Sequence, residues 1–181
     1  MTLFTSLTVL ICQAQIDKEL TNIKWDLGKE KVIYETAIVR VEGKNGISGM
    51  TNLGYKSYEK IKLETIKNAD SEMWTSEKKE KTLSMYEKFA FGGMIYLYLT
   101  RLTIDAANTN MFSIIIKDST DSKEILRKEF TSKIANVPNG DNYWWNYHSV
   151  PIPAKLKGQF FIYIIDKIGG DNNKFKFEVK Q

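Results

Sequence analysis

The sequence predicts an all-β protein: a single antiparallel β-sandwich of jelly-roll-like type over residues 15–181, with the option of one short helix around residues 71–88. Three observations lead to this prediction. Short segments rich in β-branched and aromatic residues alternate with turn-forming clusters of Gly, Asn, Asp and Ser. Helical periodicity is weak outside residues 71–88. The 181 residues suit one domain with a full hydrophobic core.

Residues 1–14 have the layout of a secretory signal peptide. An apolar run, Leu3–Ile11, precedes small residues at Cys12 and Ala14, which favours cleavage after Ala14. The run is too short to span a bilayer. Two alternatives stay open: lipid attachment at Cys12, which Leu10-Ile11 fits poorly, and a buried N-terminal strand. We therefore expect a secreted or periplasmic protein, and the lack of an Asn-x-Ser/Thr acceptor is typical of a bacterial envelope.

The first half of the remaining chain contains the least certain elements. Residues 15–31 are compatible with a short strand or an irregular segment. Val32–Val41 is rich in β-branched residues and predicts a strand, and the three glycines of Gly46–Gly54 predict a flexible loop. Tyr58–Ile66 fits either a strand or a helix, and we favour a strand. Ser71–Lys88 pairs Lys with Glu at helical distances and predicts a helix, although its apolar residues also fit an alternating strand.

The second half predicts a series of strands. Met94–Ile104 alternates most regularly and is expected to be a central strand, with Met111–Lys117 returning beside it as a hairpin. Three further strands are predicted at Glu124–Phe130, Gln159–Asp166 and Lys174–Val179. The expected core consists of Ile95, Leu97, Leu99, Phe112, Ile114, Phe161 and Ile164.

The run Tyr143–His148 contains two of the four tryptophans and the single histidine of the chain. On a strand, Trp145 would share one face with two tyrosines, whereas Trp144 would share the other with Asn146 and His148. Large aromatic faces are usually buried, so we expect Trp145 in the core and Trp144 in solvent. Val150-Pro151-Ile152-Pro153 limits backbone pairing and predicts a strand end or a sheet edge.

The exposed face of this run is the predicted binding site. An indole packs against apolar surfaces such as a sugar face, and amide and imidazole groups bond hydroxyls. A turn-forming segment, Pro138–Asn142, precedes the run, and binding residues are often found on loops. The candidate ligand-binding residues are Trp144, Asn146, His148 and Asn142.

Other chemistries lack the residues they require. One histidine and one cysteine do not make a zinc site, and no G-x-S-x-G elbow accompanies His148. Gly92-Gly93 and Gly169-Gly170 lack the lysine of a phosphate loop. Basic and acidic residues are interspersed, which argues against nucleic acid. Weak calcium candidates exist in two loops, although turn formation explains them better: Asp118, Asp121 and Glu124, and Asp166, Asp171 and Asn172.

These observations favour a secreted or periplasmic, non-catalytic binding module that has no cofactor, with glycans as the leading ligand class. The alternative is a structural or protein-interaction component of the bacterial cell envelope that uses a sheet edge or a loop surface. An enzyme with two convergent carboxylates is the third hypothesis, and no particular pair is indicated.

Overall fold

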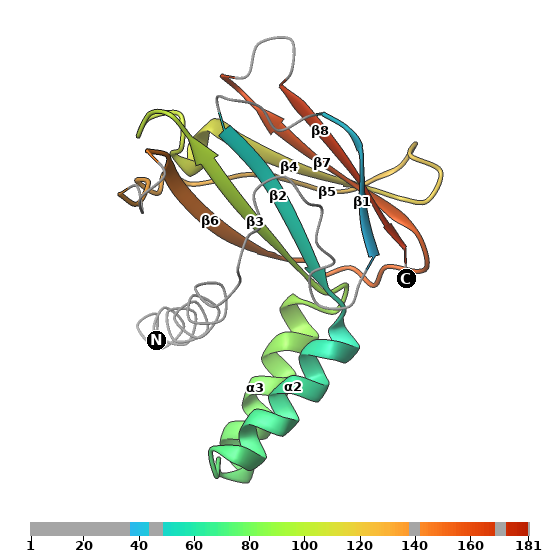
Figure 1. Ribbon diagram of the computed structural model, residues 1–181. Helices are drawn as coiled ribbons and strands as arrows, with labels where there is room; N and C mark the ends of the chain where they lie inside the picture. Colours follow the sequence, from blue (N-terminus) through green and yellow to red (C-terminus); the bar gives the residue numbers. More distant parts are fainter. Residues whose placement is uncertain (1–36, 44–48, 138–141, 169–172, 181) are drawn as a thin grey trace. The chain divides into compact units, whose positions relative to one another are not determined.

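A computed structural model describes residues 37–43, 49–137, 142–168 and 173–180, all within one compact unit, Val32–Gln181. The described strands form two antiparallel sheets, five-stranded in the order β1-β8-β7-β4-β5 and three-stranded in the order β2-β3-β6 (Figure 1). The strands are β1 (Ala37–Glu42), β2 (Gly49–Lys56), β3 (Met94–Arg101), β4 (Phe112–Lys117), β5 (Glu124–Glu129), β6 (Trp144–Pro151), β7 (Phe160–Asp166) and β8 (Lys174–Lys180). The predicted sandwich-like architecture is confirmed; the jelly-roll-like topology stays a prediction.

Two helices and a short 3-10 helix complete the described elements. Helices α2 (Tyr58–Ser71) and α3 (Ser76–Phe89) come between β2 and β3 along the chain and lie side by side. The 3-10 helix η1 (Thr109–Met111) precedes β4. The predicted signal peptide at residues 1–14, Cys12 and the first half of the predicted strand Val32–Val41 lie outside the described residues.

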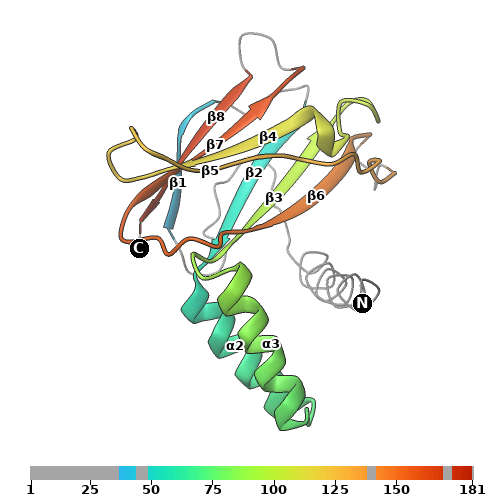
Figure 2. The ribbon, with the colours of Figure 1, turned by 180° about the vertical axis from the view of Figure 1, so that it is seen from behind.

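The core lies between the two sheets, which Figure 2 shows from behind. Alternate residues of β3 pack with alternate residues of β4 and β7, and the Tyr55 and Phe160 rings meet edge to face with centroids 5.2 Å apart. The predicted core is confirmed for Ile95, Leu97, Leu99, Phe112, Ile114 and Ile164. It is wrong for Phe161, which has the opposite strand parity to Ile164 and lies under the Lys176 ammonium, 4.5 Å from it.

Two arginines connect the sheets. The Arg101 guanidinium of β3 donates to Asp166 of β7 from Nη2 at 2.7 Å and from Nε at 3.1 Å. Arg40 of β1 donates to the Thr51 carbonyl of β2 at 2.6 Å, and Arg101 donates to the hydroxyl of the same threonine. Both members of the Arg101–Asp166 pair are buried, so the pair holds the ends of two strands from different sheets together.

The predicted hairpin of residues 94–117 is wrong. Strand β3 pairs with β2 and β6, whereas β4 pairs with β5 and β7 in the other sheet. Residues 102–111 carry the chain from one sheet to the other. Alternation of apolar residues predicted both strands and the central position of β3 correctly, but it carries no information on which strands pair.

The predicted loop Gly46–Gly54 is also wrong in its described part, because Gly49–Lys56 forms β2. Thr51, Leu53 and Tyr55 alternate toward the core. Gly49 has a φ of 147°, and a Cβ there would lie 1.9 Å from the Thr100 carbonyl oxygen. The glycine therefore permits close approach to β3 and is not the mark of a flexible loop.

The predicted helix around residues 71–88 is confirmed as α3. The predicted strand Tyr58–Ile66 is wrong, because these residues belong to α2. Ser57 and Thr75 cap the two helices, and Ile61, Thr65 and Ala69 form the buried stripe of α2 at i, i+4 spacing. No residue of α3 is fully buried. The helices are joined by a tip in which Met73 has a φ of 53°.

Candidate binding surface

Strand β6 is an edge of the three-stranded sheet, as its prolines predicted, and presents two different faces. Its residues His148 and Asn146 lie opposite Leu97 and Leu99 of β3, which are core residues. Directly opposed residues share a face of the sheet, so Trp144, Asn146 and His148 are on the core side. The predicted facing is therefore wrong, because Trp145 and Tyr147 lie on the outer side. The indoles of Trp144 and Trp145 are both half-buried, and Tyr147 is buried.

Asn146 is a structural residue in this arrangement. Its side chain is fully buried, and its amide nitrogen donates to the carbonyls of Lys133 at 2.7 Å and Ala107 at 3.2 Å. Its Oδ1 accepts from the Tyr147 backbone N–H at 3.0 Å. The Asn146 side chain therefore connects β6 to the two loops that contain Ala107 and Lys133.

The remaining candidates differ in their surroundings. The His148 ring packs on Phe130, with centroids 4.6 Å apart, and is half-buried. Asn142 is exposed in the segment before β6 and has a φ of 58°. Trp144 lies opposite Arg101 at the start of the strand. Three of the four predicted ligand residues therefore share the core side of β6, and Asn142 lies before the strand.

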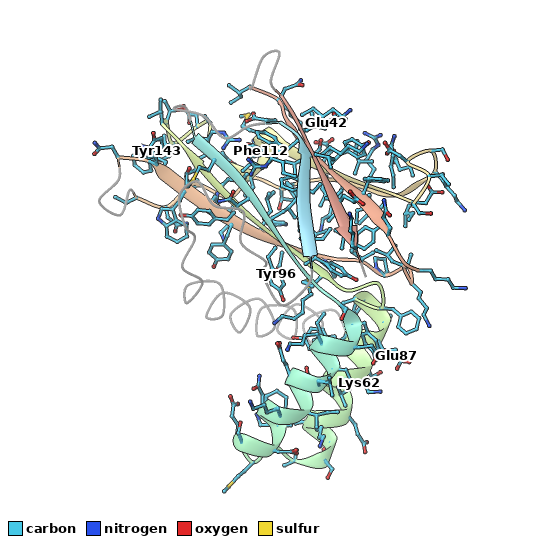
Figure 3. All side chains as sticks on the ribbon, turned by 45° about the vertical axis from the view of Figure 1, so that its right-hand side comes forward. Glu42, Lys62, Glu87, Tyr96, Phe112 and Tyr143 are labelled. Atoms are coloured by element: carbon cyan, nitrogen blue, oxygen red, sulfur yellow. The ribbon has the colours of Figure 1, made fainter. Side chains whose placement is uncertain are left out.

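The outer face of β3 and β6 instead brings together a row of aromatic rings. The Trp145 ring lies nearly parallel to Tyr98, with centroids 6.1 Å apart, and to Tyr147, with centroids 6.0 Å apart. The Lys133 ammonium lies 3.8 Å from the Tyr147 centroid. Asn52 of β2 is directly opposite Tyr98. Figure 3 shows the side chains of this sheet, with Tyr96 of β3 and Tyr143, just before β6, labelled.

This row, Tyr98, Trp145 and Tyr147, was not predicted as a site. Its sequence signal was present, because tyrosines alternate along β3 and aromatic residues alternate along β6. The signal was assigned to the core, since aromatic residues are buried more often than they form outer faces. We call these three residues the aromatic row.

The indole of Trp145 is fixed within the row by its polar end. Its Nε1 donates to the Val137 carbonyl at 3.1 Å, and its backbone forms an isolated bridge with Asn136. These contacts set the plane of the ring while the side chain is only half-buried. Tyr98 is also half-buried, whereas Tyr147 is buried, so the row is held in a defined orientation on the outer side of the sheet with Tyr98 and Trp145 partly accessible.

The three loop carboxylates proposed for calcium have separate partners. The Asp118 carboxylate accepts from Thr120, Ser122 and Lys123, and the Thr120 side-chain hydrogen bond above all lowers its pKa. The Glu124 carboxylate is paired with Arg127, whose hydrogen bond lowers its pKa.

Asp121 belongs to a different cluster on the outer face of the five-stranded sheet. Its carboxylate accepts from the Tyr163 hydroxyl at 2.6 Å and from the Lys176 ammonium at 2.8 Å. Desolvation opposes ionisation of Asp121, but the hydrogen bonds from Lys176 and Tyr163 outweigh it and lower its pKa. Burial, followed by the hydrogen bond to Asp121, raises the pKa of Tyr163.

Of the second set of calcium candidates, only Asp166 is among the described residues. Asp166 is occupied by Arg101, and Asp171 and Asn172 lie outside the described residues. In the part of the chain that the structure describes, no three His, Cys, Asp or Glu side chains converge. None of the described helices combines the length and apolar composition needed to cross a bilayer.

Comparison of the chain with protein-family models, with curated proteins and with solved structures gives no match.

Proposed function

We propose that this protein is a secreted or periplasmic, non-catalytic module that binds glycans through the aromatic row. The observation that carries the proposal is the alignment of Tyr98, Trp145 and Tyr147 on the outer face of a sheet. Aromatic rings pack on apolar surfaces, and the C–H faces of sugars are such surfaces. The Lys133 ammonium lies over Tyr147, and Asn52, whose Oδ1 accepts from Arg40, is directly opposite Tyr98; ammonium and amide groups are of the types that bond sugar hydroxyls.

Two further features support the class of protein. The predicted leader at residues 1–14 supports export. A jelly-roll-like topology is part of the proposal: the described residues form eight strands in two sheets, a number found in jelly rolls, which recur among lectin domains.

The proposal is tested by replacing Trp145 with alanine and assaying a glycan array. We expect the parent to retain a defined set of glycans and Trp145→Ala to lose them, because the middle ring of the row is gone. The matched control is Trp74→Ala, since Trp74 lies at the tip between α2 and α3. Retention of no glycan by the parent, or equal retention by both variants, would refute the proposal.

A protein-interaction role in the cell envelope is the second candidate, and the helices favour it. Met73 at the tip is 91% exposed and Leu63 on α2 is 65% exposed. Because α3 has no fully buried residue, this helical pair contributes little to the core and is available as a contact arm. Pull-down from envelope extract with the parent, but not with Leu63→Ser/Met73→Ser, would be the expected result; equal recovery by both proteins would reject this role.

A further inference from the structure

An irregular segment lies along the edge of β6 that does not pair with β3. Residues 131–137 follow β5 and are irregular apart from an isolated bridge between Asn136 and Trp145. The Asn136 N–H donates to the Trp145 carbonyl at 2.7 Å, and the Trp145 N–H donates back at 3.3 Å. We call residues 131–137 the strap. Because Trp145 belongs to the aromatic row, the strap is directly beside the proposed binding surface.

Hydrogen bonds hold the strap in place more than apolar burial does. All of its residues are described, and Ala135 is the only buried one among them. Ile134 and Val137 are each 71% exposed. Such a segment gains little free energy from apolar contacts, so its path depends on its polar anchors.

The polar anchors converge on the backbone of Lys133. Its N–H donates to Asn108 Oδ1 at 3.1 Å. Its carbonyl accepts from the Asn146 amide nitrogen at 2.7 Å and from the Thr109 N–H at 3.3 Å. Asn146 is fully buried in β6, and Asn108 is half-buried and caps η1. Both backbone groups of Lys133 are therefore bonded to parts of the fold that are fixed independently of the strap.

The other end of the strap fixes the indole of Trp145. The Val137 carbonyl accepts from Trp145 Nε1 at 3.1 Å. The Val137 side chain is exposed, so the path of the strap, and not the packing of that side chain, positions this carbonyl. Trp145 is the ring between Tyr98 and Tyr147. The plane of the middle ring of the row thus depends on how the strap runs from Lys133 to Val137.

We propose that Asn146 and Asn108 are positioning residues of the binding surface, which act on Trp145 through the strap. Neither side chain has to touch the ligand. By fixing the indole before binding, they reduce the ordering entropy that ligand contacts must offset. This role rests on the proposed function, in which the aromatic row binds glycans. It gives Asn146, which the sequence suggested as a ligand residue, a part in binding from a buried position.

Hydrogen exchange of the indole N–H measures the positioning without any ligand. Trp145→Phe assigns the Trp145 signal among the four indole resonances of a heteronuclear NMR spectrum. Asn146→Ala and Asn108→Ala should each speed exchange of this N–H by about fivefold, since its bond to Val137 is closed for less of the time. Asn108→Asp keeps an acceptor for the Lys133 N–H and should restore the parent rate.

The glycan array provides the second readout. Retention of the glycans that bind the parent should fall in both alanine variants and persist in Asn108→Asp. The matched control is Ile116→Val, because Ile116 is fully buried in β4 and its truncation lowers stability without touching the strap. This control should change neither glycan retention nor exchange of the Trp145 indole N–H.

Indole exchange at the parent rate in both alanine variants would overturn the proposal. Faster exchange with undiminished glycan retention would overturn it as well, and so would equal effects of Ile116→Val. If Asn146→Ala does not fold, Asn108→Ala decides, because Asn108 is only half-buried. A parent that retains no glycan would refute the proposed function, whereas the exchange rates would still decide whether the strap positions Trp145.

Discussion

Asp121 combines an unusual backbone conformation with a cluster of charged side chains. Its φ of 59° is in the left-handed region, which Asp and Asn tolerate better than other non-glycine residues. Its carboxylate joins the loop after β4 to Tyr163 of β7 and Lys176 of β8. The loop is therefore attached to two neighbouring strands by one side chain.

Replacement of Asp121 by Asn should reveal this attachment as a pH-dependent loss of stability. Asn preserves the backbone conformation and removes the charge, so near neutral pH the free energy of unfolding should fall by about 1 kcal/mol. Because the folded-state pKa of Asp121 is lowered, its contribution is present above the unfolded pKa of about 4 and is lost as pH falls through the folded pKa.

Urea unfolding of parent and variant across the acidic range measures this difference. The two curves should converge in acid, where the parent carboxylate is protonated. Asp105→Asn, an exposed residue of another loop, is the control and should change stability little at any pH. A parent–variant gap that widens on acidification would contradict the assignment.

Individual side chains on β6 were the least predictable part of the candidate site. Alternation correctly separated Trp144, Asn146 and His148 from Trp145 and Tyr147, but it could not say which set faces the core. The expectation that the more aromatic set is buried assigned the wrong set to the core. The inward position of Asn146 depends on the carbonyls of Ala107 and Lys133, which are remote in sequence and meet its amide only in the folded chain.

The helical pair is an insertion between two adjacent strands. Lys56, the last residue of β2, is directly opposite Met94, the first residue of β3, so a short turn could connect them. Contacts to the sheets are concentrated near the base of the pair, where Lys56 pairs with Glu64 and Tyr58 meets Phe91. Most residues of the pair are thus dispensable for the two-sheet core.

Deletion of Tyr58–Ala90, joining Ser57 to Phe91, should leave a cooperatively folding sandwich. The new four-residue hairpin loop retains Gly92, whose carbonyl accepts from the Tyr55 hydroxyl at 2.8 Å. Lys56→Thr is introduced as well, because Lys56 is buried and would lose Glu64. The control for the deletion variant is the full chain carrying Lys56→Thr.

Circular dichroism and urea unfolding measure the outcome. The helical signal should fall, whereas the free energy of unfolding should stay within about 2 kcal/mol of the control, since few core contacts are lost. Loss of cooperative unfolding would show instead that the helices are needed to organise the sandwich.

The elements themselves were predicted unevenly. Strands rich in aliphatic and aromatic residues, such as β3, β4 and β7, were identified because both their residue types and their pattern agree. Residues 58–66 were misassigned because the apolar stripe of α2 is short and includes Thr65 and Ala69, which give little hydrophobic signal. The Ser57 cap was the local signal that favoured a helix.

At the scale of the whole molecule, the Arg101–Asp166 pair is a polar connection between the two sheets at the C-terminal ends of β3 and β7. Arg101 also donates to the Met50 and Thr100 carbonyls and to Thr51 Oγ1, which satisfies its remaining nitrogens. Removing one partner leaves a buried charge without its counter-charge, which is more harmful than the loss of an exposed pair.

Asp166→Ala should therefore lower the free energy of unfolding by about 3–5 kcal/mol. Arg101→Met should also destabilise the protein, and the double variant should lose less than the sum of the two single losses, because each change alone breaks the same interaction. Urea unfolding of all four proteins completes the double-mutant cycle. Strictly additive losses would mean that the pair does not couple the sheets.

The pairing of strands was the part of the architecture that sequence patterns could not supply. The two-layer class follows from many short alternating strands, but the partners of β3 and β4 are set by the crossing of residues 102–111 between the sheets. Arg101 illustrates the limit: its role as a connection depends on Asp166, which is close to it only after folding.

The position of β8 between β1 and β7 has a consequence for biosynthesis. In the described sheet β8 is the only neighbour of β1, and their register pairs Ala37 with Lys180. During translation β1 thus has no neighbour in its sheet until β8 has left the ribosome, and such distant pairing slows folding. A nascent chain in this state exposes unpaired strand edges. Chaperones recognise such incompletely folded chains, which aggregate when chaperones are absent.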